Sequence, residues 1–160
     1  MSLVERFHKT TETTSFAGEI PVNYKYTYGL ANEDFFRTIM KKGKFLASKC
    51  ESCDVTYLPA RVFCEQCMSH LDNSFELPAV GEVFSFTVCC ENMDGSPKDK
   101  PDVIVAVKID GTDATFVHYL DDKVALEDIE IGMRVEAVFK PKAKREGSIF
   151  DIVHFKPSKN

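Results

Sequence analysis

The chain has 160 residues and a formal net charge of −5 at pH 7, with 44% apolar and 28% charged residues. That length suits one medium domain or two small ones, and the negative charge argues against a general attraction to nucleic acid or anionic membranes. No apolar run approaches the roughly 18 residues of a membrane span, and charged residues interrupt the N-terminus, so neither a span nor a signal peptide is predicted. Six cysteines, four of them in a cluster, then indicate a reducing compartment, and we expect a cytoplasmic protein.

Residues 1–30 are predicted to form an extended N-terminal arm. A tract rich in threonine and serine covers residues 10–15, and one valine and three tyrosines then alternate with other residues from Val22 to Tyr28, at the period of a strand. This arm is either a short edge strand laid over the body of the protein or a segment that docks on a partner.

Residues 32–43 are predicted to form a short helix. Asn32 is a residue type that caps helix N-termini, and Gly43 is the type that ends helices. Four apolar side chains fall on one stripe at helical spacing: Phe35, Phe36, Ile39 and Met40. The stripe either packs against the segment that follows or lines a groove.

The segment 50–67 carries two C-x-x-C pairs separated by ten residues. Each pair forms a turn that points both sulfurs the same way, and two facing turns supply four thiolates at the corners of a tetrahedron. Zinc prefers this arrangement, with Zn–S distances of about 2.3 Å. The predicted ligands are Cys50, Cys53, Cys64 and Cys67. The sequence therefore predicts a zinc ribbon with a structural metal, because four cysteines leave no position open for water or substrate.

Three other interpretations of these cysteines stay open at this point. Iron also occupies tetrahedral thiolate sites, which would make the chain a rubredoxin-like electron carrier. One C-x-x-C pair could be a redox dithiol, but such a pair needs a thioredoxin-like βαβ setting that the sequence does not indicate. Disulfides would suit an exported protein, for which the sequence gives no sign.

Asp54 and Met68 follow the second cysteine of each pair, where ribbons often have glycine to allow a left-handed backbone. Asp tolerates that conformation and Met does so poorly. The second of the two C-x-x-C turns, here called knuckles, is therefore expected to be less regular than the first.

Residues 78–160 are predicted to form a five-stranded barrel. The predicted strands are 83–89, 103–109, 115–120, 134–139 and 149–155. Asp110-Gly111 is a tight-turn signal between the second and third strands, and residues 124–132 are the one helix-compatible connection. This order matches a closed Greek-key barrel of the OB type, with an SH3-like barrel as the main structural alternative. Residues 92–100 are expected to be a polar loop.

The predicted fold class is therefore mainly β, with three parts in order. An extended arm covers residues 1–30, a helical segment with a rubredoxin-like zinc ribbon covers 31–77, and a five-stranded OB-fold barrel covers 78–160. The last boundary is placed near Pro78 and Gly81, after a polar and turn-rich stretch.

No catalytic constellation emerges from the sequence. The four histidines are scattered, with no nucleophile or carboxylate at a diagnostic offset, and nucleophile-elbow, phosphate-loop and zincin motifs are missing. The vicinal pair Cys89-Cys90 is expected to be inert packing. We therefore expect that the chain is not an enzyme.

A basic cluster lies between the fourth and fifth predicted strands and consists of Lys140, Lys142, Lys144 and Arg145. It is either a solvated loop or a phosphate contact, for a nucleotide-bearing cofactor or for nucleic acid. OB barrels that bind single strands stack bases on aromatic side chains in a basic groove, whereas the second and third strands offer only Phe116 and Tyr119, with little positive charge. A single-stranded nucleic-acid-binding protein is thus the alternative function, and nucleic acid is not the expected partner.

The order of these parts resembles the DUF35 family, the zinc-ribbon plus OB-fold proteins associated with acyl-CoA metabolism. The resemblance runs from about residue 20 to residue 157. It is carried by NEDFFRTIMKKGKFLASKC at the first knuckle, LPAR before the second, and the barrel segments GEVFSFT and IGMRVEAVF. Asp54 stands where the family commonly has glycine.

The resemblance implies a non-catalytic role. Family members look like small partner subunits of thiolase-superfamily enzymes, including acetoacetyl-CoA thiolase with hydroxymethylglutaryl-CoA synthase, and thiolase-like aldolases. They are thought to bind acyl-CoA and to hold the enzymes together, so acyl-CoA is the implied ligand and a thiolase-like enzyme the implied partner. The side chains expected to line a pantetheine slot are Phe35, Phe36 and Tyr57, and those expected to meet a phosphate are Lys44 and Arg61.

Overall fold

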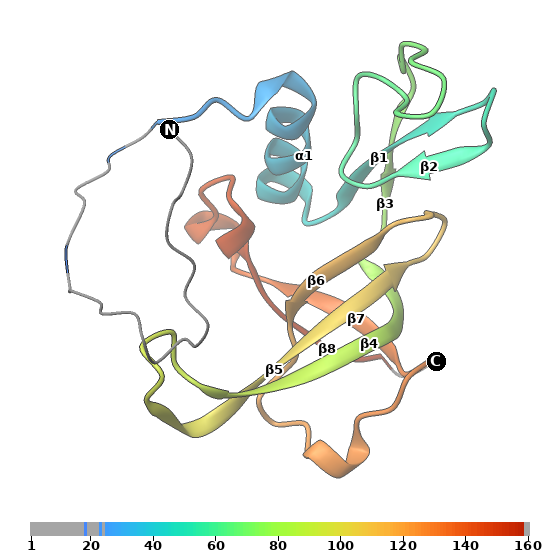
Figure 1. The fold of residues 1–160 in the computed structure, drawn as a ribbon. Coiled ribbons are helices and arrows are strands. Elements are labelled where there is room, and N and C mark those ends of the chain that lie inside the picture. The colour runs from blue at the N-terminus through green and yellow to red at the C-terminus, as the bar shows by residue number, and fades with distance from the viewer. Residues whose placement is uncertain (1–17, 19–22, 24, 159–160) are drawn as a thin grey trace, which may run out of the picture.

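The computed structural model describes residues 18, 23 and 25–158, and the fold is mainly β, as predicted (Figure 1). One helix is followed by a three-stranded sheet and then by a five-stranded sheet. The helix and strands are α1 (Gly29–Lys42), β1 (Phe45–Cys50), β2 (Val55–Tyr57), β3 (Ser74–Leu77), β4 (Val80–Glu91), β5 (Pro97–Ile109), β6 (Thr115–Tyr119), β7 (Arg134–Phe139) and β8 (Ile152–Pro157). The described residues also contain three short 3-10 turns: η2 (Leu126–Asp128), η3 (Lys142–Lys144) and η4 (Ile149–Asp151). No helix in this described part of the chain is long and apolar enough to cross a membrane.

Most of the predicted N-terminal arm, including Val22 and Tyr24, lies outside the described residues. The strand prediction is wrong where it can be compared, because residues 25–28 form no strand. The ring of Tyr28 instead packs edge-on against Phe36 of α1, with the ring centroids 5.5 Å apart. This part of the arm is therefore held by the helix that follows it.

Helix α1 begins earlier than predicted, at Gly29 instead of Asn32. Asn32 lies in the first turn, where its side-chain amide donates to the carbonyl of Tyr28 at 3.0 Å and does not cap the helix. The end of the helix is predicted correctly. Gly43 has a φ of 63°, in the left-handed region that favours glycine, and its N–H donates to the carbonyl of Ile39.

One hydrophobic core joins the helix, the three-stranded sheet and the barrel. Phe35 of α1 and Phe45 of β1 are buried, with ring centroids 5.7 Å apart. Phe45 also lies 4.9 Å from the ring of Phe116 in β6. The core is completed by Ile39, Ala47, Leu58, Ala79, Val83, Val105, Val107, Ile109, Leu120, Ile129, Val135, Ile152 and Phe155. The apolar stripe of α1 is thus core, and Figure 1 shows α1 beside β1 and over the barrel.

The three-stranded sheet has the order β2-β1-β3, with β1 antiparallel to both neighbours. β1 and β2 form a hairpin, and the first knuckle is its turn. The sequence does not predict β3, because its four residues lie within a polar, turn-rich stretch. Pairing with β1, from Phe45 opposite Leu77 to Ser48 opposite Ser74, makes it a strand.

The five-stranded sheet has the order β6-β5-β4-β7-β8, in which all neighbours are antiparallel. This is the OB-fold order, with the first strand in the middle and the third and fifth strands at the two edges. The edges meet through one parallel bridge, between Leu120 and Phe155. The prediction of full closure is wrong, because β6 ends at Tyr119 and is too short to build a ladder with β8.

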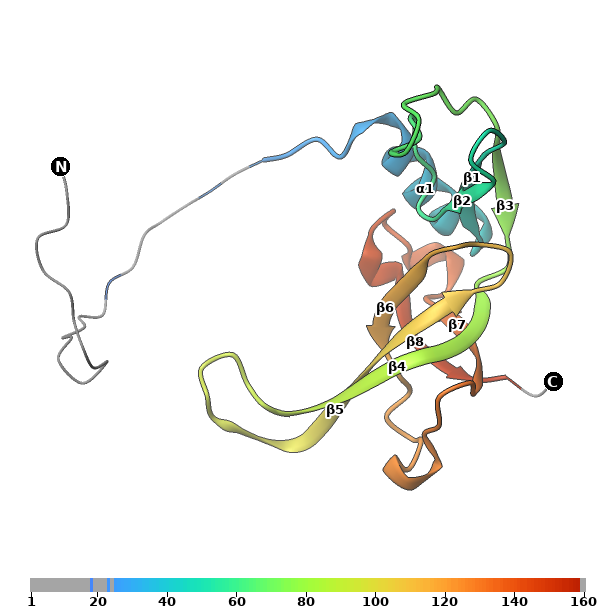
Figure 2. The same ribbon diagram turned by 45° about the vertical axis from the view of Figure 1, so that its right-hand side comes forward.

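Three connections in the barrel differ from the prediction. The predicted loop 92–100 is shorter than expected and covers only residues 92–96, because β4 runs to Glu91 and β5 begins at Pro97. The two strands leave the barrel as a two-stranded arm, here called the β4–β5 arm (residues 88–103; Figure 2). The predicted helix-compatible connection 124–132 forms only the short turn η2. The last strand begins at Ile152 because η4 precedes it.

The basic loop between β7 and β8 is tied to helix α1 through Arg145. Its guanidinium lies 5.4 Å from the ring of Phe139, and Nε donates to the carbonyl of Lys140 at 2.6 Å. Nη1 donates to the carbonyl of Ile39, near the end of α1, at 3.3 Å. Arg145 is therefore a half-buried structural residue, and the picture of a wholly solvated loop is wrong for it.

Asp151 holds the same loop from inside. The carboxylate is buried and accepts hydrogen bonds from the backbone N–H groups of Glu146, Gly147 and Ser148. Burial by itself would raise the pKa of Asp151, but the three amides outweigh burial and hold the pKa below its usual value.

Candidate metal centre

Two loops position the four predicted metal ligands. Cys50 ends β1 and Cys53 lies in the turn to β2, whereas Cys64 and Cys67 lie in the long connection between β2 and β3. The residue after each pair has a left-handed backbone, with a φ of 54° at Asp54 and 59° at Met68. The backbone is thus left-handed after both knuckles. The irregularity expected at the second knuckle because of Met68 is not seen in this angle.

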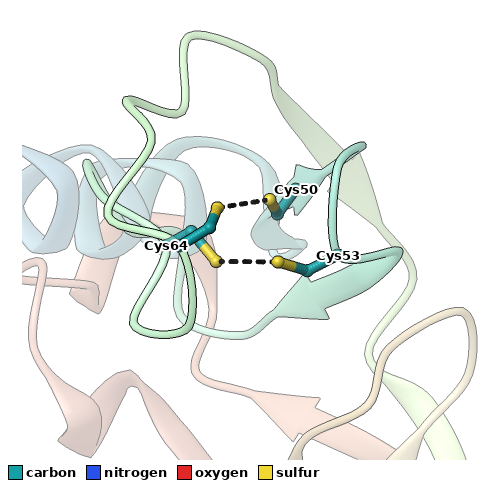
Figure 3. A group of neighbouring side chains, drawn as sticks. Cys50, Cys53 and Cys64 are labelled. Atoms are coloured by element: carbon teal, nitrogen blue, oxygen red, sulfur yellow. Dashed lines mark hydrogen bonds between the residues drawn. The ribbon is translucent and has the colours of Figure 1, made fainter.

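The four sulfur atoms are arranged as a tetrahedral metal requires. All four Sγ atoms lie within 4.8 Å of one another, and Figure 3 shows those of Cys50, Cys53 and Cys64 drawn together. Sγ of Cys50 is 3.6 Å from that of Cys67, and Sγ of Cys53 is 3.9 Å from that of Cys64. Four thiolates at about 2.3 Å from zinc would be about 3.8 Å apart. The donor set thus fits zinc, and the match needs little movement.

The same distances bear on the alternative interpretations. A disulfide would bring two sulfurs to about 2.05 Å, and all six cysteines of the chain are free. The two pairs lie in turns of a β structure, and no βαβ unit surrounds them among the described residues. The geometry accordingly favours a tetrahedral metal over a disulfide or a redox dithiol.

Two hydroxyl groups adjoin the sulfurs. The hydroxyl of Tyr57 lies 3.2 Å from Sγ of Cys64 and, by donating to it, lowers the pKa of that thiol to about 6. The hydroxyl of Ser69 lies 3.1 Å from Sγ of Cys67 and lowers the pKa of that thiol. Cys53 has the opposite shift, since its hydrogen bond with Cys67 raises its pKa to about 12. A metal ion that binds all four sulfurs must displace the remaining protons.

The sequence did not point to Ser69, and Tyr57 was predicted to contact acyl-CoA instead of a sulfur atom. Ser69 also lies 3.6 Å from Sγ of Cys50, so its hydroxyl is within reach of both knuckles. A hydroxyl residue two positions after the last cysteine was the available signal. Nothing in the sequence shows that the Tyr57 side chain turns toward Cys64.

The five residues predicted to contact acyl-CoA do not form one exposed surface. Phe35 is in the core, and Tyr57 is buried with its hydroxyl at Cys64. Lys44 lies past the far end of α1, exposed, and 3.5 Å from the carboxylate of Glu76. The ring of Phe35 contacts that of Phe36, and the ring of Tyr57 lies under the guanidinium of Arg61, but Phe35 and Tyr57 are buried. Neither is open to a ligand.

Phe36 and Arg61 line two hollows that meet at Tyr28. The helix–ribbon hollow, of about 470 Å³, is lined by residues 28–32 and 59–62, which include Arg61. The helix–loop hollow, of about 260 Å³, is lined by Tyr28, Phe36 and further residues of α1, with Gly147 on its far side. Sequence reasoning did not single out Tyr28 as a lining residue.

A third hollow lies at the seam between β6 and β8, where the barrel is only partly closed. Its volume is about 410 Å³, and it is lined by residues 100–103 and 124–126 and by Tyr119, Leu120, Asp122, Val153 and His154. None of the predicted acyl-CoA residues borders it. Its one lysine, Lys100, donates to the backbone and carboxylate of Asp122, which leaves little positive charge for a nucleic-acid backbone.

Two family models match successive parts of the chain. Residues 38–72 match the rubredoxin-like zinc ribbon domain of ChsH2, and residues 75–140 match the C-terminal OB-fold domain of ChsH2. Together the two matches cover well over half of the chain. The zinc ribbon match and the four-cysteine cluster support a structural zinc.

Known proteins resemble most of the length of this chain. A DUF35 domain-containing scaffold protein from Methanocaldococcus jannaschii is 28% identical over 129 residues, which are 78% of this chain and 89% of that protein. A solved DUF35-family protein of unknown function from Sulfolobus solfataricus has a TM-score of 0.61 at 22% identity and covers 81% of this chain and 87% of its own. The solved Ltp2-ChsH2(DUF35) aldolase has a TM-score of 0.58 at 22% identity, and the match covers 83% of this chain and 98% of the aldolase chain. The predicted resemblance is thereby confirmed, and the chain belongs to the DUF35 family.

Proposed function

We propose that this chain is a non-catalytic, acyl-CoA-binding scaffold subunit that partners a thiolase-superfamily enzyme. Two relatives support the proposal by what they are called, one a scaffold protein and the other a component of an Ltp2-ChsH2 aldolase. In this proposal the zinc ion is held by Cys50, Cys53, Cys64 and Cys67 and has a structural role only.

The observation that carries the proposal is the exposed apolar surface around the helix–ribbon hollow. Leu30, at the start of α1, is 78% exposed, and Tyr28 is more than half exposed; both line this hollow. Large apolar side chains gathered on a surface indicate a binding site. Arg61 adds a guanidinium to the same hollow, and guanidinium groups bind phosphates through paired hydrogen bonds.

The two adjoining hollows suggest a path for the ligand. Tyr28 borders both, and its ring contacts Phe36. An acyl-CoA lying across Tyr28 would have its phosphates at Arg61 and its pantetheine arm near Phe36. Arg61 forms an ion pair with Glu65, but this pair is exposed and costs little to exchange for a phosphate.

Calorimetric titration with acetoacetyl-CoA tests this site. We expect Arg61→Ala to weaken binding at least tenfold. Arg134→Ala, which removes a guanidinium paired with Asp110 in the barrel and away from both hollows, should bind like the wild type. Unchanged affinity in Arg61→Ala would remove Arg61 from the site. An absence of binding both alone and with a partner enzyme would refute the acyl-CoA proposal.

Complex formation tests the scaffold role separately. The full chain is mixed with a purified thiolase-like enzyme from the same organism and analysed by size-exclusion chromatography. Leu30→Asp should weaken the complex, whereas Leu126→Asp, at an exposed leucine of η2, should not. Failure to form a complex, together with oligonucleotide binding that weakens as salt is raised, would favour the nucleic-acid alternative.

A further inference from the structure

Tyr57 and Ser69 supply the two hydroxyl groups closest to the four-cysteine centre. Tyr57 is the last residue of β2 and is only 5% exposed, with its hydroxyl 3.2 Å from Sγ of Cys64. Ser69 follows the second knuckle and lies 3.1 Å from Sγ of Cys67 and 3.6 Å from Sγ of Cys50. Once the four sulfurs bind a metal they are thiolates, which can only accept hydrogen bonds. Both hydroxyls are therefore placed to donate.

We propose that Tyr57 and Ser69 are positioning residues of the metal centre, which bind no metal themselves but stabilise the thiolates by hydrogen bonding and so set how tightly the metal is held. A divalent cation with four thiolates has a net charge of −2. That charge is costly to keep in the protein, because Cys50 and Cys64 are buried. Two donors that each withdraw charge from sulfur reduce this cost.

The two donors serve different parts of the centre. The Tyr57 hydroxyl reaches Cys64, which has no exposure to solvent, so water cannot replace the hydrogen bond. Ser69 reaches the exposed Cys67, where water can partly replace it. We therefore infer that loss of the Tyr57 hydroxyl has the larger effect.

Arg61 strengthens the Tyr57 donor. Its guanidinium carbon lies 4.8 Å from the centroid of the Tyr57 ring, on the face of the ring, where a cation is attracted to the π electrons. A positive charge there withdraws electron density from the ring and makes the hydroxyl a better donor. Arg61, Tyr57 and Cys64 thus connect the surface of the helix–ribbon hollow to the metal centre.

Metal affinity of the full chain provides the first test. Zinc-loaded wild type and variants are titrated with a chromogenic chelator, and Tyr57→Phe keeps the buried ring while removing only the hydroxyl. We expect zinc affinity to fall about tenfold or more in Tyr57→Phe, in the range found for groups that orient metal ligands, and by less in Ser69→Ala. Tyr119→Phe, at an exposed tyrosine of β6, should retain wild-type affinity.

Cobalt-substituted protein separates hydrogen bonding from mere packing. Hydrogen bonds lower the energy of the sulfur lone pairs, so their loss should move the sulfur-to-cobalt charge-transfer band to longer wavelength in Tyr57→Phe and, less, in Ser69→Ala. A fall in affinity with an unmoved band would mean that Tyr57 only fills space, and would overturn the proposal. Unchanged affinity and spectrum would overturn it as well. If Tyr57→Phe fails to fold, Ser69→Ala, at a half-buried position, tests the proposal by the same two measurements.

Discussion

Replacing Phe45 by alanine should destabilise the helix, the ribbon sheet and the barrel by the same amount. Phe45 begins β1 and is completely buried. Its ring contacts Phe35 of α1, Phe116 of β6 and Phe139 of β7, with centroids 5.7, 4.9 and 6.2 Å away. It is thus the side chain at which the three parts of the fold meet.

The magnitude follows from burial. Removing a fully buried phenylalanine side chain costs about 3–5 kcal/mol, and we expect the upper part of that range because three aromatic neighbours lose their contacts. The free energy of unfolding of a domain of this size is roughly 5–15 kcal/mol. The substitution would therefore remove a large part of it. Phe45→Leu, which leaves a smaller cavity, should cost about 1–2 kcal/mol. Phe150→Ala, at a phenylalanine that is 74% exposed, should cost less than about 1 kcal/mol.

Native-state hydrogen exchange followed by mass spectrometry is the appropriate assay, because it reports each element separately. In the wild type, the slowest amides of α1, β1, β4 and β5 should exchange with one common free energy. In Phe45→Ala that value should fall equally in all four elements. An α1 or β1 that opens well before the barrel, or a fall below about 1.5 kcal/mol, would refute the shared core and would favour separate units at 31–77 and 78–160.

Three further outcomes are expected. Gly81→Ala should lower the free energy of unfolding, measured in urea, by about 3 kcal/mol or more, because a Cβ there would lie 2.1 Å from the carbonyl oxygen of Lys108. Gly95→Ala has open space around it and should lose only the roughly 1 kcal/mol that a positive φ costs. Equal losses in the two variants would contradict this reasoning. Because the folded pKa of Asp151 is below its unfolded value of about 3.9, its carboxylate stabilises the fold above that pH and loses the effect as pH falls through the folded pKa. Asp151→Asn should therefore have a lower free energy of unfolding in urea than the wild type at pH 7, and this difference should narrow below about pH 4. A difference that does not change with pH would contradict the stabilising role of the carboxylate. Removing zinc by chelation should release one ion per chain and speed hydrogen exchange in residues 50–72 more than in α1, since the sulfur cluster is separate from the main core; equal effects would contradict that separation.

The sequence is most informative where the structure depends on short-range spacing. Two C-x-x-C pairs define four converging sulfurs because each turn is local, and the strand pattern from Val103 to Phe139 follows from alternation within each strand. Gly43 ends α1 for an equally local reason, its left-handed backbone. These features need no knowledge of distant neighbours.

The rest depends on contacts between parts far apart in the sequence. Phe35 and Phe36 are adjacent on the same predicted stripe, yet only Phe35 is fully buried, because β1 and the barrel cover one side of α1. Arg145 belongs to a basic run, but its position against α1 makes it structural. Tyr57 is turned toward Cys64 by the second knuckle, which no periodicity could indicate. The acyl-CoA residues stay a prediction for the same reason.

The β4–β5 arm has a consequence for handling the isolated protein. Among the described residues, no strand pairs with the outer edge of β4 after Val83. That edge reads FSFTVCC from residue 84 to residue 90, without the lysine or proline that commonly keeps an exposed edge from recruiting a foreign strand. Concentrated preparations are therefore expected to aggregate through this segment. A partner subunit that covered this edge would prevent such aggregation.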